Sequence, residues 1–240
     1  MKALIFAAGF GERMRPLTER TPKPLLCVGD TPLIVWHLRK LAALGIREAI
    51  INTSWLAEQF PQTLGDGSAF GLRIVYSHEG ATPLETGGGM LHALPLLGEA
   101  PFLLVNGDIW TDFDFAQLAP EPRGLAQLVL VDPPVYAAHG DFALLPDARV
   151  RSDGAPLLTY AGIGVYRPTL LRDWQAAFDT PSDHVTPPRF PLAPILRAHM
   201  HADRIHGLRH RGRWTDVGTP QRLAELNEAL KLLKLGNQGG

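Results

Sequence analysis

Short apolar runs alternate with amphipathic segments through the first half of the chain. Four runs rich in β-forming residues predict strands, at 2–8, 48–53, 72–77 and 101–106. Between the first two, apolar residues recur at helical spacing from Ile34 to Leu44, and Gly45 can end that helix. Further helices are expected near Ser54 and from Thr86. Strands that alternate with helices are typical of βαβ units around a parallel sheet.

The second half changes to shorter strands separated by loops rich in Pro, Gly and Asp. The predicted strands are 127–132, 142–145 and 158–166. Thr219 as N-cap and Pro220 at the first helical position predict a final amphipathic helix. We expect one domain over residues 1–235, with halves of about 1–115 and 116–235, followed by a flexible tail at 236–240.

Composition narrows the classes of function. The 240 residues are 45% hydrophobic, enough for a full core, and 23 basic against 24 acidic residues give a net charge of -1. Extended nucleic-acid binding is therefore not expected, because no global positive field exists to hold a polyanion. The apolar N-terminal run passes directly into Gly9-Phe10-Gly11, without a signal-peptide pattern, and no run reaches membrane-spanning length. A cytoplasmic protein is expected, in which the single cysteine, Cys27, is a buried small hydrophobe.

The most informative motif follows the first predicted strand. Gly9 and Gly11 are followed by Arg13, Arg15 and Lys23, in a string that also holds Pro16-Leu17-Thr18 and Pro22-Lys23-Pro24. Glycines let an anion approach the backbone N–H groups, and the cations can neutralise phosphate charge. A bare Gly-x-Gly is usually an ordinary tight turn. The dinucleotide fingerprint would need a third glycine in place of Met14, and the Gly-Lys-Ser/Thr of a P-loop is absent.

The extended string resembles the signature loop of the sugar-1-phosphate nucleotidyltransferase family, and the resemblance covers most of the chain. It implies an α/β fold: a Rossmann-like three-layer α/β/α nucleotidyltransferase fold with a central mixed, mostly parallel sheet. It also implies that Arg13 binds the pyrophosphate leaving group and Lys23 holds the phosphates, as the two catalytic cations. The positions that the resemblance assigns to nucleotide binding are Ala8, Gly9, Gly11, Glu12, Arg13, Lys23, Glu79 and Gly88.

Two aspartates match the metal ligands of this family. Asp108 follows the apolar run 102–105 in Asn-Gly-Asp, which taken alone is a common strand-ending turn. Asp216 lies in Trp-Thr-Asp-Val-Gly-Thr-Pro, where the family has its second carboxylate. The resemblance thus implies Mg2+ as cofactor, since this hard ion needs only one or two carboxylates beside phosphate oxygens and water. Such a metal would reduce repulsion between two anionic substrates during an in-line displacement.

The substrates are a nucleoside triphosphate and a sugar 1-phosphate by the same resemblance. The segments 84–89 and 159–166 look most like the uridylyltransferase branch, which uses UTP and N-acetylmuramate 1-phosphate in cell-wall recycling. The expected sugar-binding residues are Asn106, Gly140, Asp141 and Gly162. The usual Glu-Lys-Pro element before the last predicted strand is missing, so no residue is assigned as a second phosphate-binding lysine. For a lactyl carboxylate the candidates are Arg149, Arg151 and the arginines within 209–213.

Several alternatives stay open. Glu79 could accept a hydrogen bond from uracil or guanine, or be a solvated loop acid, so guanylyl and thymidylyl transfer stay as alternatives. A non-catalytic nucleotide-sugar sensor would keep the fold, and a nicotinamide-dependent oxidoreductase would need the missing glycine. The histidines at 199, 201, 206 and 210 fit no zinc spacing and are expected in surface or hairpin roles. Without hexapeptide repeats of a β-helix, a monomer or weak dimer is expected.

Overall fold

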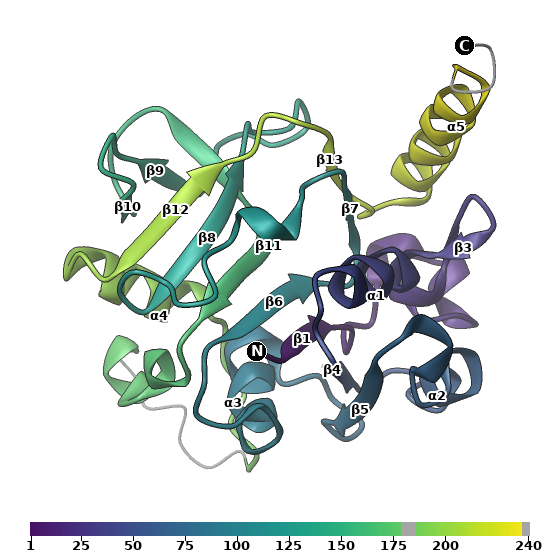
Figure 1. Cartoon of the computed structure of the whole chain (residues 1–240), viewed down its shortest axis with the longest axis horizontal. Helices are drawn as coiled ribbons and strands as arrows, with labels where there is room; N and C mark the ends of the chain where they lie inside the picture. Colours follow the sequence, from purple (N-terminus) through teal and green to yellow (C-terminus); the bar gives the residue numbers. More distant parts are fainter. Residues whose placement is uncertain (179–185, 237–240) are drawn as a thin grey trace.

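The computed structural model describes residues 1–178 and 186–236 and is built around a nine-stranded sheet (Figure 1). Its seven principal strands are β1 (Ala3–Phe6), β4 (Glu48–Thr53), β5 (Arg73–His78), β6 (Phe102–Asn106), β8 (Ala126–Val131), β11 (Leu157–Tyr166) and β12 (Ile205–Arg209). The smaller strands are β2 (Cys27–Val28), β3 (Thr31–Pro32), β7 (Ile109–Thr111), β9 (Phe142–Leu144), β10 (Val150–Arg151) and β13 (Trp214–Asp216). The helices are α1 (Leu33–Ala43), α2 (Gln59–Leu64), α3 (Glu85–Leu97), α4 (Ala193–His201) and α5 (Pro220–Gly236).

Strand direction divides the sheet. β5, β4, β1 and β6 are neighbours in that order and run parallel, and β12 runs parallel to β8. β11 lies between β6 and β8 and is antiparallel to both. The predicted α/β/α fold with a mixed, mostly parallel sheet is therefore confirmed. Because β1 and β6 are parallel neighbours, the loops that leave their carboxyl ends meet at one edge of the sheet.

The two faces of the sheet are covered by different helices. Ala3 and Ile5 of β1 belong to the apolar cluster that contains α1, whereas Leu4 between them belongs to the cluster that contains α3 and α4. This period of two is what the pleat of a strand requires, and strands buried on both faces read as continuous apolar runs. Each fully buried aliphatic side chain contributes about 1.5–3 kcal/mol. The core thus fixes the strand ends from which the functional loops start.

Helix α5 projects from the body in Figure 1, and its inner side joins a third apolar cluster. Leu226 and Leu230 contact this cluster, which also contains Met14 of the first loop and Val217. The Thr219 hydroxyl accepts a hydrogen bond from the Arg222 amide at 3.3 Å, as an N-cap should. The packing brings α5 against the loop after β1. Of the predicted flexible tail, residue 236 is the last of α5, and 237–240 lie outside the described residues.

Some expectations were wrong in detail. The helix predicted near Ser54 begins at Gln59, after turns that include Leu56 at φ +49°. Cys27 is exposed on β2 rather than buried. His206 is buried on β12, 7% exposed, rather than in a surface role.

Over residues 1–178 and 186–236, no group of three or more His, Cys, Asp and Glu is arranged to hold a metal ion.

Among the helices that the structure describes, none combines the length and apolar character needed to cross a bilayer.

Candidate active site

A cavity of about 550 Å³ lies at the carboxyl ends of β1 and β6. Its walls come from the loop after β1, from β4, from the segment before α3 and from the turn after β6. The residues that line it include Ala8, Gly9, Gly11, Glu12, Arg13, Lys23, Asn52, Glu79, Pro83, Glu85, Thr86, Asn106, Asp108 and Gly218. Most of the residues predicted to bind the nucleotide are therefore brought together at one site.

The first loop has the backbone that an anion-binding loop needs. Gly11 has φ +64°, and a Cβ there would lie 2.8 Å from Cγ2 of Thr18, so any side chain would be both strained and obstructed. The Thr18 hydroxyl donates to the Gly11 carbonyl at 2.8 Å and holds the turn. A Cβ added to Gly9 would meet nothing within 4 Å, so the backbone of this residue is open to a ligand. Met14 stands where a dinucleotide fold would have glycine and is fully buried.

Charged groups gather at one end of the cavity. Lys23 is 8% exposed, and its Nζ lies 2.6 Å from Oδ2 of Asp108. Asp216 lies on β13, whose register pairs it with Ile109, the residue after Asp108. The Val217 amide donates to the Asp108 carbonyl at 2.9 Å. The two carboxylates thus come from adjoining backbone segments at one edge of the molecule.

Asp216 has two partners that the sequence did not single out. Arg222 Nη1 donates to Asp216 Oδ2 at 2.6 Å, and the hydroxyl of Tyr136 donates to Asp216 Oδ1. The guanidinium of Arg222 lies 3.4 Å from the centroid of the Tyr136 ring. Burial, and then the neighbouring Asp216, raise the pKa of Tyr136 to about 12, so its hydroxyl stays protonated as a donor. A Cβ on Gly218 would lie 2.7 Å from Arg222 Nη1 and 3.4 Å from Arg13 Nη2, so a larger residue there would displace the ends of these side chains.

Glu79 lines the cavity but is not a solvated loop acid. It is 5% exposed, and its two carboxylate oxygens accept hydrogen bonds from Asn52 Nδ2 at 2.6 Å and from the Leu84 amide at 2.7 Å. Asn52 Oδ1 in turn accepts from the Ala7 amide at 2.6 Å. Burial raises the pKa of Glu79, although these hydrogen bonds lower it in part. The network joins the loop after β1 to the segment before α3, which are two walls of the cavity.

The start of α3 also lines the cavity. Glu85 and Thr86 lie on the cavity, and Glu85 has φ +63°. Gly88 is buried and does not line the cavity, because it packs against the segment 186–192. A Cβ on Gly88 would lie 2.4 Å from the Pro188 carbonyl oxygen. The structure therefore gives Gly88 a close backbone approach to a neighbouring segment, one helical turn from the ligand space.

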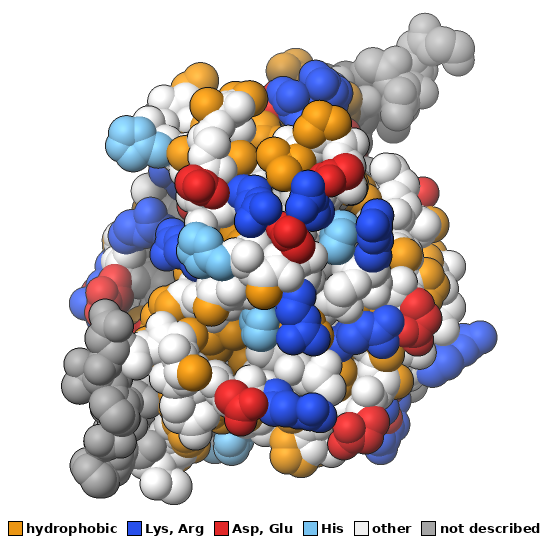
Figure 2. Space-filling view, turned by 90° about the vertical axis from the view of Figure 1, so that its left-hand side faces the viewer, with side chains coloured by type: hydrophobic (Ala, Val, Ile, Leu, Met, Phe, Trp, Pro, Cys, Tyr) orange, Lys and Arg blue, Asp and Glu red, His pale blue; other side chains and the backbone are white. Residues whose placement is uncertain are grey.

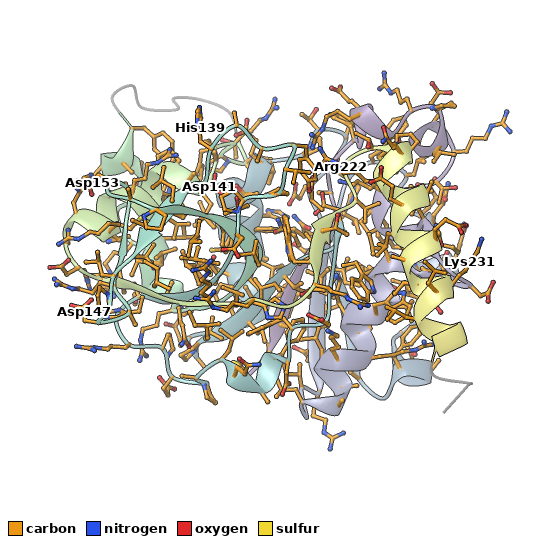
Figure 3. All side chains as sticks on the ribbon, turned by 90° about the horizontal axis from the view of Figure 1, so that it is seen from above. His139, Asp141, Asp147, Asp153, Arg222 and Lys231 are labelled. Carbon is orange, nitrogen blue, oxygen red and sulfur yellow. The ribbon has the colours of Figure 1, made fainter. Side chains whose placement is uncertain are left out.

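The predicted sugar-binding residues lie beside β11. Asn106 lines the cavity, and a Cβ on Gly162, which has φ +72°, would lie 2.6 Å from Asn106 Nδ2. Asp141 Oδ2 accepts from the Tyr160 amide at 2.8 Å, and a Cβ on Gly140 would meet the backbone of Leu157 at 2.6 Å. Asp141 is labelled left of the middle of the view from above and Arg222 right of it (Figure 3). The loop from 132 to 141 spans between them, since Tyr136 within it reaches Asp216.

Three of the arginines considered for an acidic sugar group have acidic protein partners. Arg149 and Arg151 both pair with Asp203 at 2.8 Å, at the end of α4. Arg209 pairs with Asp132 on the sheet. The face of the molecule that Figure 2 presents mixes Lys and Arg with Asp and Glu in this way. None of these three arginines lines the cavity, so the residue for an acidic substituent stays open.

Comparison with known proteins gives a consistent result. A family model described as nucleotidyl transferase matches residues 2–138. The chain is 48% identical over 94% of its length to N-acetylmuramate alpha-1-phosphate uridylyltransferase of Neisseria meningitidis, covering 96% of that protein. It is 34% identical over 91% of its length to the protein of the same name from Caulobacter vibrioides, covering 92% of it. Among solved structures, a Bacillus anthracis protein described as a candidate glucose-1-phosphate thymidylyltransferase has a TM-score of 0.79 at 21% identity, with 95% and 94% of the two chains covered. That likeness concerns the fold.

Proposed function

The chain belongs to the nucleotidyl transferase family, and from that premise we propose that it transfers a uridylyl group from UTP to N-acetylmuramate 1-phosphate and releases pyrophosphate. The choice of UTP and of this sugar rests on the similarity to the Neisseria and Caulobacter enzymes. Such a reaction would return a cell-wall sugar to nucleotide-sugar form. It would take place in the cytoplasm, where UTP is made.

The observation that carries the proposal is the charged end of the cavity. Arg13, Lys23 and Asp108 line the cavity beside a glycine loop that an anion can approach, and Asp216 lies next to them on β13, where its carboxylate and the Arg13 guanidinium both approach Gly218. A structural ion pair would explain Lys23 and Asp108 alone. It would not explain why Arg13, which has no ion pair among the described residues, lines the same cavity beside the loop of Gly9 and Gly11.

In the proposed reaction, a phosphate oxygen of the sugar 1-phosphate attacks the α-phosphorus of the nucleotide. The bond between that phosphorus and the oxygen bridging to the β-phosphate breaks, and pyrophosphate leaves with both electrons of the bond. Arg13 would bind the departing pyrophosphate, and Lys23 would offset charge on the phosphates as it shifts during transfer. The protein also orients the two substrates in line, and no covalent enzyme intermediate is needed.

Asp108 and Asp216 fit a magnesium ion. Both are hard oxygen donors, and two carboxylates with phosphate oxygens and water are a usual magnesium environment. When bound, Mg2+ would reduce the repulsion between the two anionic substrates. Arg222 and Tyr136, which contact Asp216, would then orient the carboxylate from outside. A monomer or weak dimer is proposed for the assembly, and light scattering at several protein concentrations would test it.

The experiment is pyrophosphate release across four nucleoside triphosphates and the 1-phosphates of glucose, mannose, N-acetylglucosamine and N-acetylmuramate, with and without Mg2+. A signal confined to UTP with N-acetylmuramate 1-phosphate is expected. Another productive pair would keep the reaction and change the substrate, and silence throughout would favour a sensor. Asp108→Asn should abolish turnover with the fold intact. Its control is Asp153→Asn, because Asp153 is an exposed carboxylate that is labelled at the left of Figure 3, away from Arg222.

A further inference from the structure

Strand β7 connects the backbone of the two aspartates of the site, and it does not belong to the large sheet. In the described part of the chain it pairs with β13, in a separate two-stranded sheet with three residues in each strand. Ile109, its first residue, directly follows Asp108 and is the register partner of Asp216. A two-stranded ribbon of this length is not stable by itself. Contacts that hold Ile109 in place therefore also fix the backbone that carries both carboxylates.

The backbone of β7 directs its polar groups to two opposite edges. On the edge that faces β13, the Asp108 carbonyl accepts from the Val217 amide at 2.9 Å, and the Asp112 amide donates to the Arg213 carbonyl at 3.1 Å. Successive residues of a strand direct their N–H and C=O groups to opposite edges. The carbonyls of residues 109, 111 and 113 consequently point away from β13, to an edge where the described residues place no strand.

Side chains of α1 occupy this outer edge. His37 Nε2 lies 2.8 Å from the Ile109 carbonyl oxygen, and Lys40 Nζ donates to the carbonyls of Thr111 at 2.6 Å and Phe113 at 2.9 Å. A carbonyl can only accept, so the hydrogen bond requires His37 to carry its proton on Nε2. The two donors are three positions apart and share one face of the helix. Helix α1 thus satisfies the carbonyls that a third strand would otherwise satisfy.

Both side chains stand where an apolar residue would suit α1. His37 is 1% exposed, and Lys40 Nζ lies 5.6 Å from the centroid of the Phe115 ring. Burying an imidazole or an ammonium group is unfavourable unless it is hydrogen-bonded, and leucine at either position would continue the apolar face of the helix. Packing of α1 on the sheet therefore does not account for these residues, whereas the carbonyls of β7 do. Arg39, between them in the sequence, is exposed.

We propose that His37 and Lys40 are positioning residues for the metal site: by anchoring the outer edge of β7, they set the separation of Asp108 and Asp216. They act through the backbone of β7. The inference rests on the proposed function, because it takes the two aspartates as metal ligands. Mg2+ requires a nearly ideal octahedron of oxygens, so a small displacement of β7 weakens its binding.

Three variants remove or keep the anchor. Lys40→Met keeps the length of the side chain but removes both hydrogen bonds, and Lys40→Arg keeps donors for both carbonyls. His37→Leu removes the other donor and tests the same edge independently. The matched control is Arg39→Met, which removes one positive charge from the exposed side of the same helix.

The first measurement is Mn2+ binding by electron paramagnetic resonance, without nucleotide, at a temperature at which circular dichroism shows every variant to be folded. We expect the dissociation constant to rise about 10-fold in Lys40→Met and in His37→Leu, as for other residues that orient metal ligands from outside. Lys40→Arg should bind Mn2+ nearly as tightly as the wild type, and Arg39→Met should be unchanged.

The second measurement is amide hydrogen exchange, which reports local opening of the backbone. In Lys40→Met, peptides that contain residues 109–113 and 214–217 should exchange faster, whereas a peptide from β4 should exchange as in the wild type. This result would show that the loss of affinity arises from the pairing of β7 with β13, rather than from a general loosening of the fold.

A role of the two residues in stability alone predicts a lower melting temperature with unaltered Mn2+ affinity. That result would overturn the proposal, and so would an equal loss of affinity in Arg39→Met. A wild type that transfers the uridylyl group without binding Mn2+ would overturn it as well and leave the reaction standing. A wild type that binds Mn2+, and loses affinity in Lys40→Met, but uses no sugar 1-phosphate would contradict the proposed function and support this inference.

Discussion

Replacing Glu79 by glutamine changes one atom of the side chain, yet we expect a clear loss of stability. The hydrogen-bond network around Glu79 has a backbone donor at each end, the Ala7 amide and the Leu84 amide. Asn52 uses its oxygen for Ala7, so only its NH2 group is left to face residue 79. Both neighbours of Glu79 are therefore donors, and the group between them must accept from both. A carboxylate does so, and an amide cannot.

The expected loss of stability follows from the number of hydrogen bonds that glutamine can keep at position 79. Glutamine can accept from one neighbour only, and its own NH2 then faces the other donor inside a site that is 5% exposed. A buried unsatisfied donor costs about 1–3 kcal/mol, and the lost bond to a charged acceptor was worth about 1.5–3 kcal/mol. Removing a buried charge offsets part of this, since burial raises the pKa of Glu79. We expect a net loss of about 2 kcal/mol, or roughly 4–8 °C in melting temperature for a chain of this size.

Urea unfolding followed by fluorescence would measure the change, with Glu99→Gln as the control because Glu99 is exposed. The midpoint should fall in Glu79→Gln with an unchanged slope. The KM for the nucleotide should rise severalfold, because the network joins two walls of the cavity, while the KM for the sugar 1-phosphate should change little. A stability loss below about 0.5 kcal/mol would refute the argument that the site requires a group that only accepts.

Three further changes test other parts of the molecule. Burial lowers the pKa of His37 to about 4, so the folded protein keeps it neutral while the unfolded chain takes up a proton near pH 6.5. The free energy of unfolding should therefore fall by roughly 3 kcal/mol as the pH drops from 6.5 to 4. In urea titrations, His37→Gln should flatten that pH dependence. Tyr136→Phe keeps the ring on Arg222 but removes the hydroxyl that contacts Asp216. The affinity for Mn2+, measured by electron paramagnetic resonance, should weaken about 10-fold with little change in melting temperature. An unchanged affinity would exclude the proposed role of Tyr136 in orienting Asp216. Thr219→Ala removes the N-cap of α5 and should cost about 1 kcal/mol in urea unfolding, whereas an unaltered midpoint would mean that apolar packing alone holds this end of the helix.

The parallel half of the fold could be predicted because its strands are buried on both faces. The run 48–53 coincides with β4, and the helix marked by Ile34 and Gly45 is α1. The strand β12 was missed, since its residues 205–209 mix His, Gly and Arg with two apolar positions and carry no clear period. Its burial comes from pairing with β8, which is a tertiary effect. The three-residue strands β7 and β13 are too short for any period to be visible.

The residues of the site also divide into those that the sequence predicted and those that it did not. Gly9, Arg13, Lys23 and Asp108 follow strand ends or a recognisable string, and the structure brings them to one cavity. Tyr136 could not be found, because its contact with Asp216 joins residues 80 positions apart and no local pattern surrounds it. The sequence around Arg222 and Glu85 indicates only weakly that these residues belong to the site.

For those two residues, the decisive property is visible only in the structure. Arg222 lies in the first turn of α5, where a cation is unfavourable to the helix dipole and must have another reason to be there. Glu85 is notable only once its backbone angle is known.

The antiparallel strand β11 explains why the sequence rules predicted the residues after β1 and β6 more directly than those on β11. In a parallel sheet, functional residues follow the carboxyl ends of strands, and this rule leads from β1 to Gly9 and from β6 to Asp108. β11 is antiparallel to β6, so the residue it brings beside Asn106 is Gly162, from the middle of the strand. There the pairing with β8 shifts register between Tyr160 and Gly164, which leaves room for a residue at φ +72°. A bulge within an antiparallel strand thus supplies what a strand end supplies elsewhere, and a side chain at Gly162 should displace Asn106 from its place in the cavity lining.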